Sequence, residues 1–302
     1  MKEQYINLNG ILTPYSEAKL HVSSVAVKYG ASVFEGIRGY WNNEQDQLYL
    51  FSLHSHIERL FESMKLMKMK HNYSPEEIIV QIEETIKRND IKEDCYVRVA
   101  ASIEENGPID SQGPVLINIA AFPLGRKPKQ DGIKVSISSW TRISDNMMPP
   151  RIKCVANYQN GRLALIQAKE DGYDNTILLN KNGKISEAPT ATVFFVKNGI
   201  MYTPSRTCGI LESITREFLI NVALKKGIKI VEREVDRSEC YVSDEAFLCG
   251  TGAEIIPIIS IDKHIIGDGR QGRLTTELRD IYIKTVYGQF NENRKYLYPI
   301  YE

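Results

Sequence analysis

The sequence has no long hydrophobic run and few cysteines, and both absences narrow what the protein can be. No apolar stretch approaches the ~20 residues that a membrane-spanning helix requires. The first ten residues, MKEQYINLNG, contain no apolar signal-peptide segment. No CxxC motif occurs, which argues against a zinc site or a disulfide framework. We therefore predict a cytoplasmic protein without a membrane segment, with reduced thiols at Cys95, Cys154, Cys208, Cys240 and Cys249.

Neither sign of charge is in excess. Thirty-eight basic and 38 acidic residues cancel to a formal net charge of zero, so we expect no binding to nucleic acid. The P-loop motif G-x-x-x-x-G-K-[ST] and the dinucleotide-binding motif G-x-G-x-x-G are also absent. The composition, 42% hydrophobic and 25% charged, is that of a soluble globular protein, and 302 residues suggest about two domains.

Local signals predict short strands and capped helices. A hairpin is expected near the N-terminus, because Asn9-Gly10 is the pair that a type I′ turn prefers. A helix is expected over residues 56–68, with an S-x-x-E capping box formed by Ser55 and Glu58. A second helix is expected to begin after Ser74, which is followed by proline and two glutamates.

The stretch PLGRKPKQDG, residues 123–132, is the best candidate for an interdomain linker, because it concentrates proline, glycine and basic residues. It separates a small N-terminal domain, residues 1–122, from a larger C-terminal domain, residues 133–302. Strand-to-helix junctions recur in both, so we predict an α/β (α+β) fold. In the larger domain we expect strands over 133–139, 175–180, 193–196, 200–203, 228–231, 246–249 and 255–259, and helices near 160–171, 214–226 and 270–288.

One lysine has mainly apolar neighbours in the stretch MMPPRIKCVANYQNG, residues 147–161. Lys153 is flanked by Ile152, Cys154 and Val155 rather than by polar residues. Its neighbourhood alone favours a surface charge at a strand edge. The alternative is a desolvated amine, because burial disfavours the charged form and leaves a nucleophile able to form a Schiff base.

Two more charged residues each allow a structural and a functional interpretation. Glu187 precedes a β-branched and aromatic strand, where it is either a surface charge or a carboxylate that keeps a cofactor nitrogen protonated. Arg59 lies near Glu58 and Glu62 on a predicted helix, which on average indicates a solvated face. Its planar fork of donors also suits a phosphate.

Two anion-binding turns are predicted in the C-terminal half. Ser213 is expected to cap a helix whose first N–H groups, at Ile214 and Thr215, can receive a phosphate. The strand FLCGTGAE, residues 247–254, ends in a Gly-Thr-Gly turn whose amides and Thr251 hydroxyl can bind an anion. Each signal alone is weak.

The strand CYVRVA places Tyr96 and Arg98 on one face and apolar side chains on the other. That face is either an ordinary solvent face or a cleft suited to a carboxylate. His54 and His56 form an H-x-H pair, but nothing in the sequence supplies the further ligands that a metal site needs. We therefore expect no metal.

The order and spacing of these signals resemble the class IV, fold-type IV, pyridoxal-phosphate-dependent aminotransferases, and most closely the branched-chain amino acid aminotransferases. The resemblance runs from about residue 5 to 288. It is carried by VKYGASVFEGIRGY (27–40), HSHIERLFESM (54–64), YVR (96–98), AAFP (120–123), SSW (138–140), K....NY (153–158), ISEAPTATVFF (185–195), ITRE (214–217) and GTGAEI (250–255). It implies a two-domain fold-type IV enzyme with a small α/β sandwich and a larger pseudo-barrel α/β domain.

The resemblance also implies roles for named residues. Lys153 is implied to form the Schiff base with pyridoxal 5'-phosphate, Tyr158 to hydrogen-bond its phenolic oxygen, and Glu187 to face its ring nitrogen. The implied phosphate site consists of Arg59, Ile214, Thr215 and Thr251. The implied substrate site consists of Tyr96 with the amides of Thr251 and Gly252 for the α-carboxylate, Arg98 as a second carboxylate-oriented group, and Tyr29, Phe34, Gly36 and Leu124 around the side chain.

The implied activity is ping-pong transamination between a branched-chain or other hydrophobic L-amino acid and 2-oxoglutarate. The implied assembly is a homodimer, with a hexamer as the alternative. Three rival activities stay open: a transaminase for a D-amino acid, (R)-amine or specialised biosynthetic keto acid, an aminodeoxychorismate-type lyase, and a binding protein without catalysis.

Departures from the family pattern concentrate around the substrate. The family usually has asparagine where this chain has Thr192, and glycine where it has Ser213. Leu124 replaces an aromatic residue, the loop 104–113 does not match, and the linker 123–132 looks shortened. We expect an intact cofactor site beside an altered substrate pocket.

Overall fold

The computed structural model describes residues 3–126 and 131–301 and divides into two compact units. Unit 1 comprises Met1–Arg126, Ile152–Ala156 and Lys284–Glu302, and unit 2 comprises Lys127–Arg151 and Asn157–Ile283. The predicted linker, 123–132, spans the first division, although its residues 127–130 lie outside the described residues. The predicted domain limits stay a prediction. Two segments that fall in the predicted C-terminal domain, Ile152–Ala156 and Lys284–Glu302, belong to unit 1 by their contacts. Residues of both segments hydrogen-bond to strands of unit 1.

Unit 1 is built on an antiparallel sheet with strand order β15-β4-β3-β5-β6-β1-β2. The Asn9-Gly10 turn joins β1 to β2 with φ of 50° and 85°, which confirms the predicted hairpin. The bounds are β1 Tyr5–Leu8, β2 Ile11–Pro14, β3 Ser32–Asn42, β4 Gln47–Phe51, β5 Cys95–Ile103, β6 Val115–Pro123 and β15 Leu297–Pro299.

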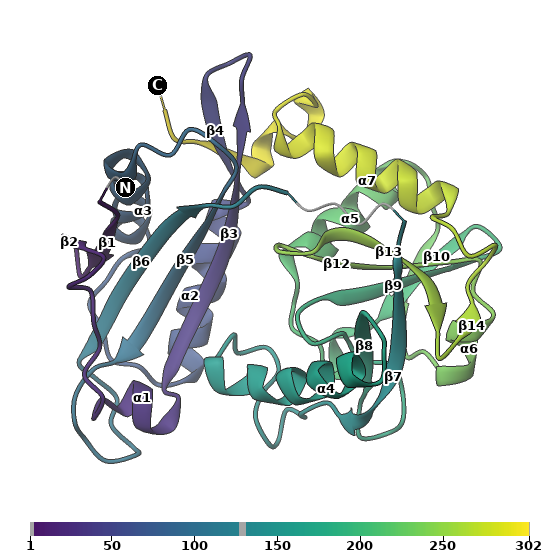
Figure 1. Ribbon diagram of the computed structural model, residues 1–302, viewed down its shortest axis with the longest axis horizontal. Helices are drawn as coiled ribbons and strands as arrows, with labels where there is room; N and C mark the ends of the chain where they lie inside the picture. Colours follow the sequence, from purple (N-terminus) through teal and green to yellow (C-terminus); the bar gives the residue numbers. More distant parts are fainter. Residues whose placement is uncertain (1–2, 127–130, 302) are drawn as a thin grey trace. The chain divides into compact units, whose positions relative to one another are not determined.

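Helices α2 (Leu53–Leu66) and α3 (Pro75–Asn89) pack against this sheet, α2 on β3 and α3 on β6 and β1 (Figure 1). The predicted start of α3 is confirmed, because Ser74 and Glu77 form a capping box. The capping box predicted at Ser55 is wrong: α2 begins three residues earlier than predicted, and Ser52 at its cap adopts the left-handed conformation without a side-chain cap bond. The short helix α1 covers Val25–Tyr29.

Unit 2 contains a mixed sheet with strand order β11-β10-β9-β12-β13-β7-β8, and β14 pairs with β13. Its core is formed by inward residues such as Val193, Phe195, Leu248 and Ile258. The bounds are β7 Ile133–Thr141, β8 Asn175–Leu179, β9 Thr192–Lys197, β10 Ile200–Pro204, β11 Ile230–Arg233, β12 Glu245–Gly250, β13 Glu254–Ile261 and β14 His264–Ile265.

The helices of unit 2 pack against this sheet, α4 on β7 and β8, and α5 on β12 and β11. The predicted cap of α5 is confirmed, since Ser213 Oγ accepts from Arg216 N (3.3 Å), and Gly227 follows the helix end with a φ of 71°. The bounds are α4 Tyr158–Glu170, α5 Ile214–Lys225, α6 Arg237–Tyr241 and α7 Arg273–Val286, of which Lys284 onward belongs to unit 1.

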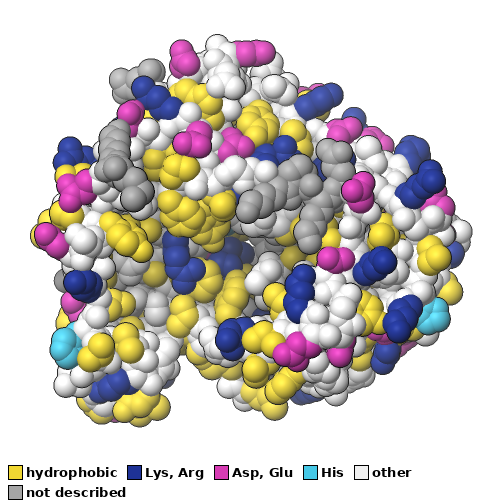
Figure 2. All heavy atoms as spheres, in the orientation of Figure 1, with side chains coloured by type: hydrophobic (Ala, Val, Ile, Leu, Met, Phe, Trp, Pro, Cys, Tyr) yellow, Lys and Arg dark blue, Asp and Glu magenta, His cyan; other side chains and the backbone are white. Residues whose placement is uncertain are grey.

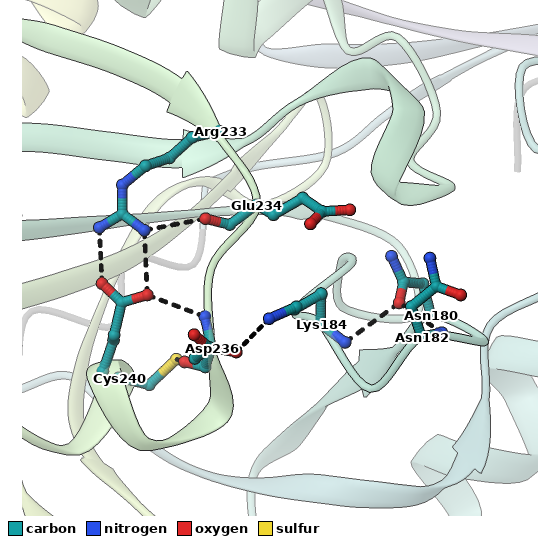
Figure 3. A network of polar contacts seen from close by, with 8 residues as sticks. Asn180, Asn182, Lys184, Arg233, Glu234, Asp236 and Cys240 are labelled. Atoms are coloured by element: carbon teal, nitrogen blue, oxygen red, sulfur yellow. Dashed lines mark hydrogen bonds and ion pairs between the residues drawn. The ribbon is translucent and has the colours of Figure 1, made fainter.

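A polar network fixes the turn that precedes Glu187 (Figure 3). Lys184 pairs with Asp236 (2.5 Å), and Arg233 forms two bonds to the Glu239 carboxylate (2.9 and 2.6 Å). Asp236 and Glu239 also form the capping box of α6. The segment that leads to Glu187 is therefore held from outside as well as by its own strand contacts.

The surface matches the balanced composition. Figure 2 shows acidic and basic side chains interspersed on the face in view, without one sign gathering over a large area. Within the described residues, no helix is long and apolar enough to cross a membrane. All five cysteines lie in that part of the chain, where they are buried and form no disulfide.

Candidate active site

Lys153 belongs to a short segment that extends the sheet of unit 1. The first half of β3 pairs with β5 on one side, and the segment Ile152–Ala156 takes the other side. There Phe34 N donates to Lys153 O (2.9 Å) and Cys154 pairs with Val33. Ser63 Oγ on α2 accepts from Lys153 N (3.2 Å). Two elements therefore fix the lysine backbone, while its side chain is only partly buried.

The aromatic ring of Phe34 lies close to two cationic side chains. Lys153 Nζ is 5.0 Å from the ring centroid and Arg98 Cζ is 4.0 Å from it. The apolar neighbours that the sequence indicated, Ile152 and Cys154, are buried. The structure thus brings Lys153, Phe34 and Arg98 together within unit 1.

Gly36 and Tyr96 make a close approach on the same face of the sheet. Gly36 on β3 pairs with Arg98 on β5, and Arg38 pairs with Tyr96. Because side chains alternate between the two faces of a strand, Gly36, Arg38, Tyr96 and Arg98 all belong to the same face of the sheet. A Cβ on Gly36 would lie 1.8 Å from Tyr96 Oη, so the tyrosine hydroxyl occupies the space that a side chain would need. On β5, Tyr96 and Arg98 are partly buried between fully buried neighbours, which confirms the predicted alternation.

The other predicted substrate residues of unit 1 are less enclosed. Tyr29 is the last residue of α1 and is 49% exposed. Leu124 is partly buried and its N donates to Asp94 O (2.8 Å), just beyond the end of β6. Nothing in the contacts of unit 1 explains why leucine replaces the family's aromatic residue there.

Arg59 does not lie on a solvated helix face. It is 8% exposed, and it pairs with Glu35 on β3 rather than with Glu58 or Glu62. Sequence reasoning missed this partner, because Glu35 lies 24 residues away and no local pattern connects the two. It also missed His56, whose Nδ1 lies 2.6 Å from the same carboxylate.

Opposing effects set the charges of this buried cluster. Burial alone would raise the pKa of the Glu35 carboxyl, but the charge of Arg59 and the hydrogen bonds from Arg59 and His56 outweigh it and hold the pKa well below its usual range. Burial lowers the pKa of His56, and the nearby charges of Arg59 and Lys153 lower it further against the pull of Glu35. The result is an ionised Glu35 beside a neutral His56.

His54 and His56 lead to different surroundings. His54 is exposed and meets the ring of Tyr298 edge-on, whereas His56 is fully buried against Glu35. In the part of the chain that the structure describes, no group of three or more His, Cys, Asp or Glu side chains is arranged to hold a metal ion.

In unit 2, Glu187 is buried and held at both carboxylate oxygens. Arg142 Nη2 lies 2.7 Å from one, and Leu211 N donates to the other (3.1 Å). Both contacts stabilise negative charge on the carboxylate. Arg142 was also missed from the sequence, because it is 45 residues from Glu187 along the chain.

The start of α5 follows closely after Leu211. Thr215 is buried in the first turn of this helix, whose N–H groups have no partner inside the helix. Arg216 anchors the turn, because its Nη2 reaches Glu232 (2.7 Å) and Pro204 O (2.9 Å). The serine at position 213 serves as the helix cap, which gives this departure from the family a structural role.

Thr251 follows the end of β12, beside β9. Thr192 on β9 contacts the last part of β12, with its Oγ1 3.3 Å from Cys249 O and 3.1 Å from Cys249 Sγ. Gly252 is exposed, and no described atom lies within 4 Å of the position where its Cβ would be. The Thr192 hydroxyl therefore ties β9 to the last part of β12, the strand from which the Gly-Thr-Gly turn emerges.

Comparison with known proteins identifies the family of this chain. The family model "Amino-transferase class IV" matches residues 32–261. The chain is 38% identical to the "Probable branched-chain-amino-acid aminotransferase" of Aquifex aeolicus, over 97% of this chain and 96% of that protein.

Solved structures give the same result. A branched-chain aminotransferase from Thermoproteus uzoniensis with norvaline is similar with a TM-score of 0.95 and 38% identity, over 99% of this chain and 100% of that one. A branched-chain amino acid aminotransferase from Thermobaculum terrenum in its PLP form has a TM-score of 0.94 and 40% identity, over 99% of each chain. The fold-type IV expectation is confirmed, and the chain belongs to the class IV aminotransferases.

Proposed function

We propose that this protein is a pyridoxal-phosphate-dependent transaminase that exchanges an amino group between a branched-chain L-amino acid and 2-oxoglutarate. Class IV aminotransferases depend on pyridoxal phosphate, and the similar proteins with which the chain shares its full length carry the branched-chain name. The observation that carries the proposal is Lys153, an amine fixed by its backbone to β3 and α2 in the same unit as the buried Arg59.

The chemistry of the donor set fits the cofactor. Pyridoxal phosphate presents an aldehyde, a ring nitrogen, a phenolic oxygen and a phosphate, and each needs a different partner. Lys153 supplies an amine, Glu187 a buried carboxylate and Tyr158 a phenol. For the phosphate the chain supplies a guanidinium, a helix N-terminus and a hydroxyl, at Arg59, at Ile214 and Thr215, and at Thr251.

Bound pyridoxal phosphate supplies an electron sink that stabilises negative charge at the substrate Cα. Lys153 Nζ would take the proton from the substrate Cα as a general base and deliver it, as a general acid, to the cofactor carbon that carried the aldehyde. Glu187, oriented by Arg142 and Leu211 N, keeps the ring nitrogen protonated, because an opposite charge favours the charged form. Tyr158 donates to the phenolic oxygen.

The proposed substrate contacts come from the residues that the resemblance singled out. Tyr96 and the amides of Thr251 and Gly252 bind the α-carboxylate, and Arg98 is oriented toward a carboxylate. Tyr29, Phe34, Gly36 and Leu124 surround the substrate side chain. Absence of a side chain at Gly36 gives Tyr96 its position, and Phe34 offers the apolar contact that a branched side chain prefers.

A panel of amino donors tests the substrate assignment. The enzyme with bound cofactor is given 2-oxoglutarate and the L- or D-enantiomer of leucine, isoleucine or valine, and glutamate formation is measured. We expect activity with all three L-enantiomers, ping-pong kinetics, and no activity with the D-enantiomers. Activity with D-amino acids alone, or release of pyruvate without an acceptor, would overturn the assignment.

We further propose that the enzyme is a cytoplasmic homodimer. Its five buried cysteines are free, as expected in a reducing compartment. Large apolar side chains of unit 1, including Ile11, Val22 and Ile109, are more than two-thirds exposed and suit burial in an interface. Light scattering of the purified protein measures the mass, and twice the chain mass of 34.4 kDa is expected.

A further inference from the structure

Glu35 is a fully buried carboxylate with two partners on one helix. It lies on the face of β3 that α2 covers, and α2 presents His56 and Arg59 toward it, three residues apart. Arg59 Nε lies 2.7 Å from Oε1 and Nη2 lies 2.9 Å from Oε2, and His56 Nδ1 lies 2.6 Å from Oε2. Both carboxylate oxygens are thus engaged.

The two bonds from Arg59 fix the plane of its guanidinium. A guanidinium carries five N–H groups in a rigid fork, and two parallel bonds to a carboxylate set its direction as well as its position. Glu35 engages the Nε and Nη2 edge. The orientation of the rest of the fork then follows from β3, a strand inside the sheet, rather than from the flexible arginine side chain.

His56 completes the clamp as a neutral donor. Because burial keeps its pKa low, the ring carries its one proton on Nδ1, where Glu35 accepts it. Its Nε2 is buried and has no hydrogen-bond partner among the described residues. An unpartnered acceptor is less costly than an unpartnered N–H, which agrees with this tautomer.

The same strand and helix also fix Lys153. Phe34, the residue before Glu35, donates its N–H to Lys153 O, and Ser63, four residues after Arg59 on α2, accepts from Lys153 N. A single β3–α2 contact therefore sets the positions of the amine and the guanidinium together.

We propose that Glu35 is a positioning residue for the cofactor's phosphate: it orients Arg59, and His56 holds Glu35 in turn. The inference rests on the proposed function, in which Arg59 binds that phosphate. Glu35 contributes geometry and not charge, because its negative charge offsets part of the positive charge of Arg59.

Two ligands that differ only in the phosphate test this proposal. Apoenzyme is titrated with pyridoxal phosphate and with pyridoxal, and binding is followed by visible absorbance. Glu35→Gln should weaken pyridoxal phosphate binding roughly tenfold to a hundredfold, as expected for lost bonds to a charged group, and leave pyridoxal binding unchanged. Glu58→Gln is the matched control, because Glu58 is an exposed acid next to Arg59 on the same helix.

Further variants separate a positioning role from a purely structural one. If Glu35 acts through Arg59, Glu35→Gln should have little effect on binding once Arg59→Gln is present. His56→Leu provides a second test if Glu35→Gln does not fold, because His56 is fully buried and leucine is an apolar side chain that suits a buried position. It should cause a smaller loss that again requires the phosphate.

The outcomes distinguish the two proposals. If Arg59→Gln weakens both ligands equally, the proposed role of Arg59 at the phosphate fails. If Arg59→Gln is phosphate-specific but Glu35→Gln is not, the positioning role is overturned and the proposed function stands. Tighter binding of pyridoxal phosphate by Glu35→Gln would also overturn it, because Glu35 would then act by charge alone.

Discussion

Adding one methyl group at Gly36 should displace Tyr96. A Cβ at Gly36 would lie 1.8 Å from Tyr96 Oη and 2.5 Å from Cζ, whereas real Cβ contacts do not fall below 3.0 Å. In Gly36→Ala the hydroxyl must therefore move by at least 1.2 Å, from 1.8 to 3.0 Å. The ring is partly exposed, so it can turn away while β3 stays paired with β5.

The size of the effect follows from the role proposed for Tyr96. A hydrogen bond to a charged group contributes about 1.5–3 kcal/mol, which corresponds to roughly a 10- to 150-fold loss in kcat/KM. Most of this loss should appear in KM for the amino acid, since the α-carboxylate is bound before and during the reaction. The unfolding midpoint should change little, because the displaced ring moves toward solvent.

Steady-state kinetics with L-leucine and thermal unfolding check this prediction together. Tyr96→Phe, which removes the hydroxyl without adding a Cβ, should show a loss of similar size. Gly125→Ala is the matched control, because no described atom lies within 4 Å of its Cβ position. Wild-type kcat/KM in Gly36→Ala would refute the reasoning, as would a loss explained entirely by unfolding.

Acid should destabilise the protein in two steps. Burial keeps the pKa of His56 in the folded protein below its ordinary value of 6.5, so below pH 6.5 the unfolded chain binds a proton that the folded protein does not. His56→Leu should therefore flatten the fall in unfolding free energy below pH 6.5. Burial would raise the pKa of Glu35, but Arg59 and His56 lower it below 4.5 in the folded protein. The ionised Glu35 therefore stabilises the fold above pH 4.5, and this contribution is lost as the pH falls below 4.5. Glu35→Gln should remove this part of the pH dependence of the unfolding free energy. Thr192→Val removes the hydroxyl beside Cys249 and should lower the urea-unfolding free energy by about 1 kcal/mol.

Local signals in the sequence predicted local structure well. The capping box of α3, the Asn9-Gly10 hairpin and the Ser213 cap each depend on residues within four positions of one another, and all are confirmed. The capping box at Ser55 is wrong because the helix begins three residues further toward the N-terminus than predicted.

Strand β3 could not be predicted in the same way. It is buried along nearly all its length, so it shows no alternation of polar and apolar residues, and it contains Gly36, Gly39 and the charged Glu35 and Arg38. Its charges are acceptable only because distant segments cover them. For Glu35 those partners come from α2, 21 and 24 residues away.

The candidate site shows the same limit. The resemblance singled out Lys153, Glu187 and Arg59, whose types match the cofactor's groups. It did not reveal the residues that hold them, because Glu35, Ser63 and Arg142 act through contacts that only the fold creates. The long-range supports of a site are therefore the part that a single sequence does not show.

The identity of the cofactor-bearing lysine is the most direct test of the account. The yellow enzyme with bound pyridoxal phosphate is reduced with borohydride and digested, and the peptides are analysed by mass spectrometry. We expect one phosphopyridoxyl group, on Lys153, and no labelled peptide from Lys153→Ala. Attachment to another lysine, or a colourless protein that takes up no pyridoxal phosphate, would contradict the account.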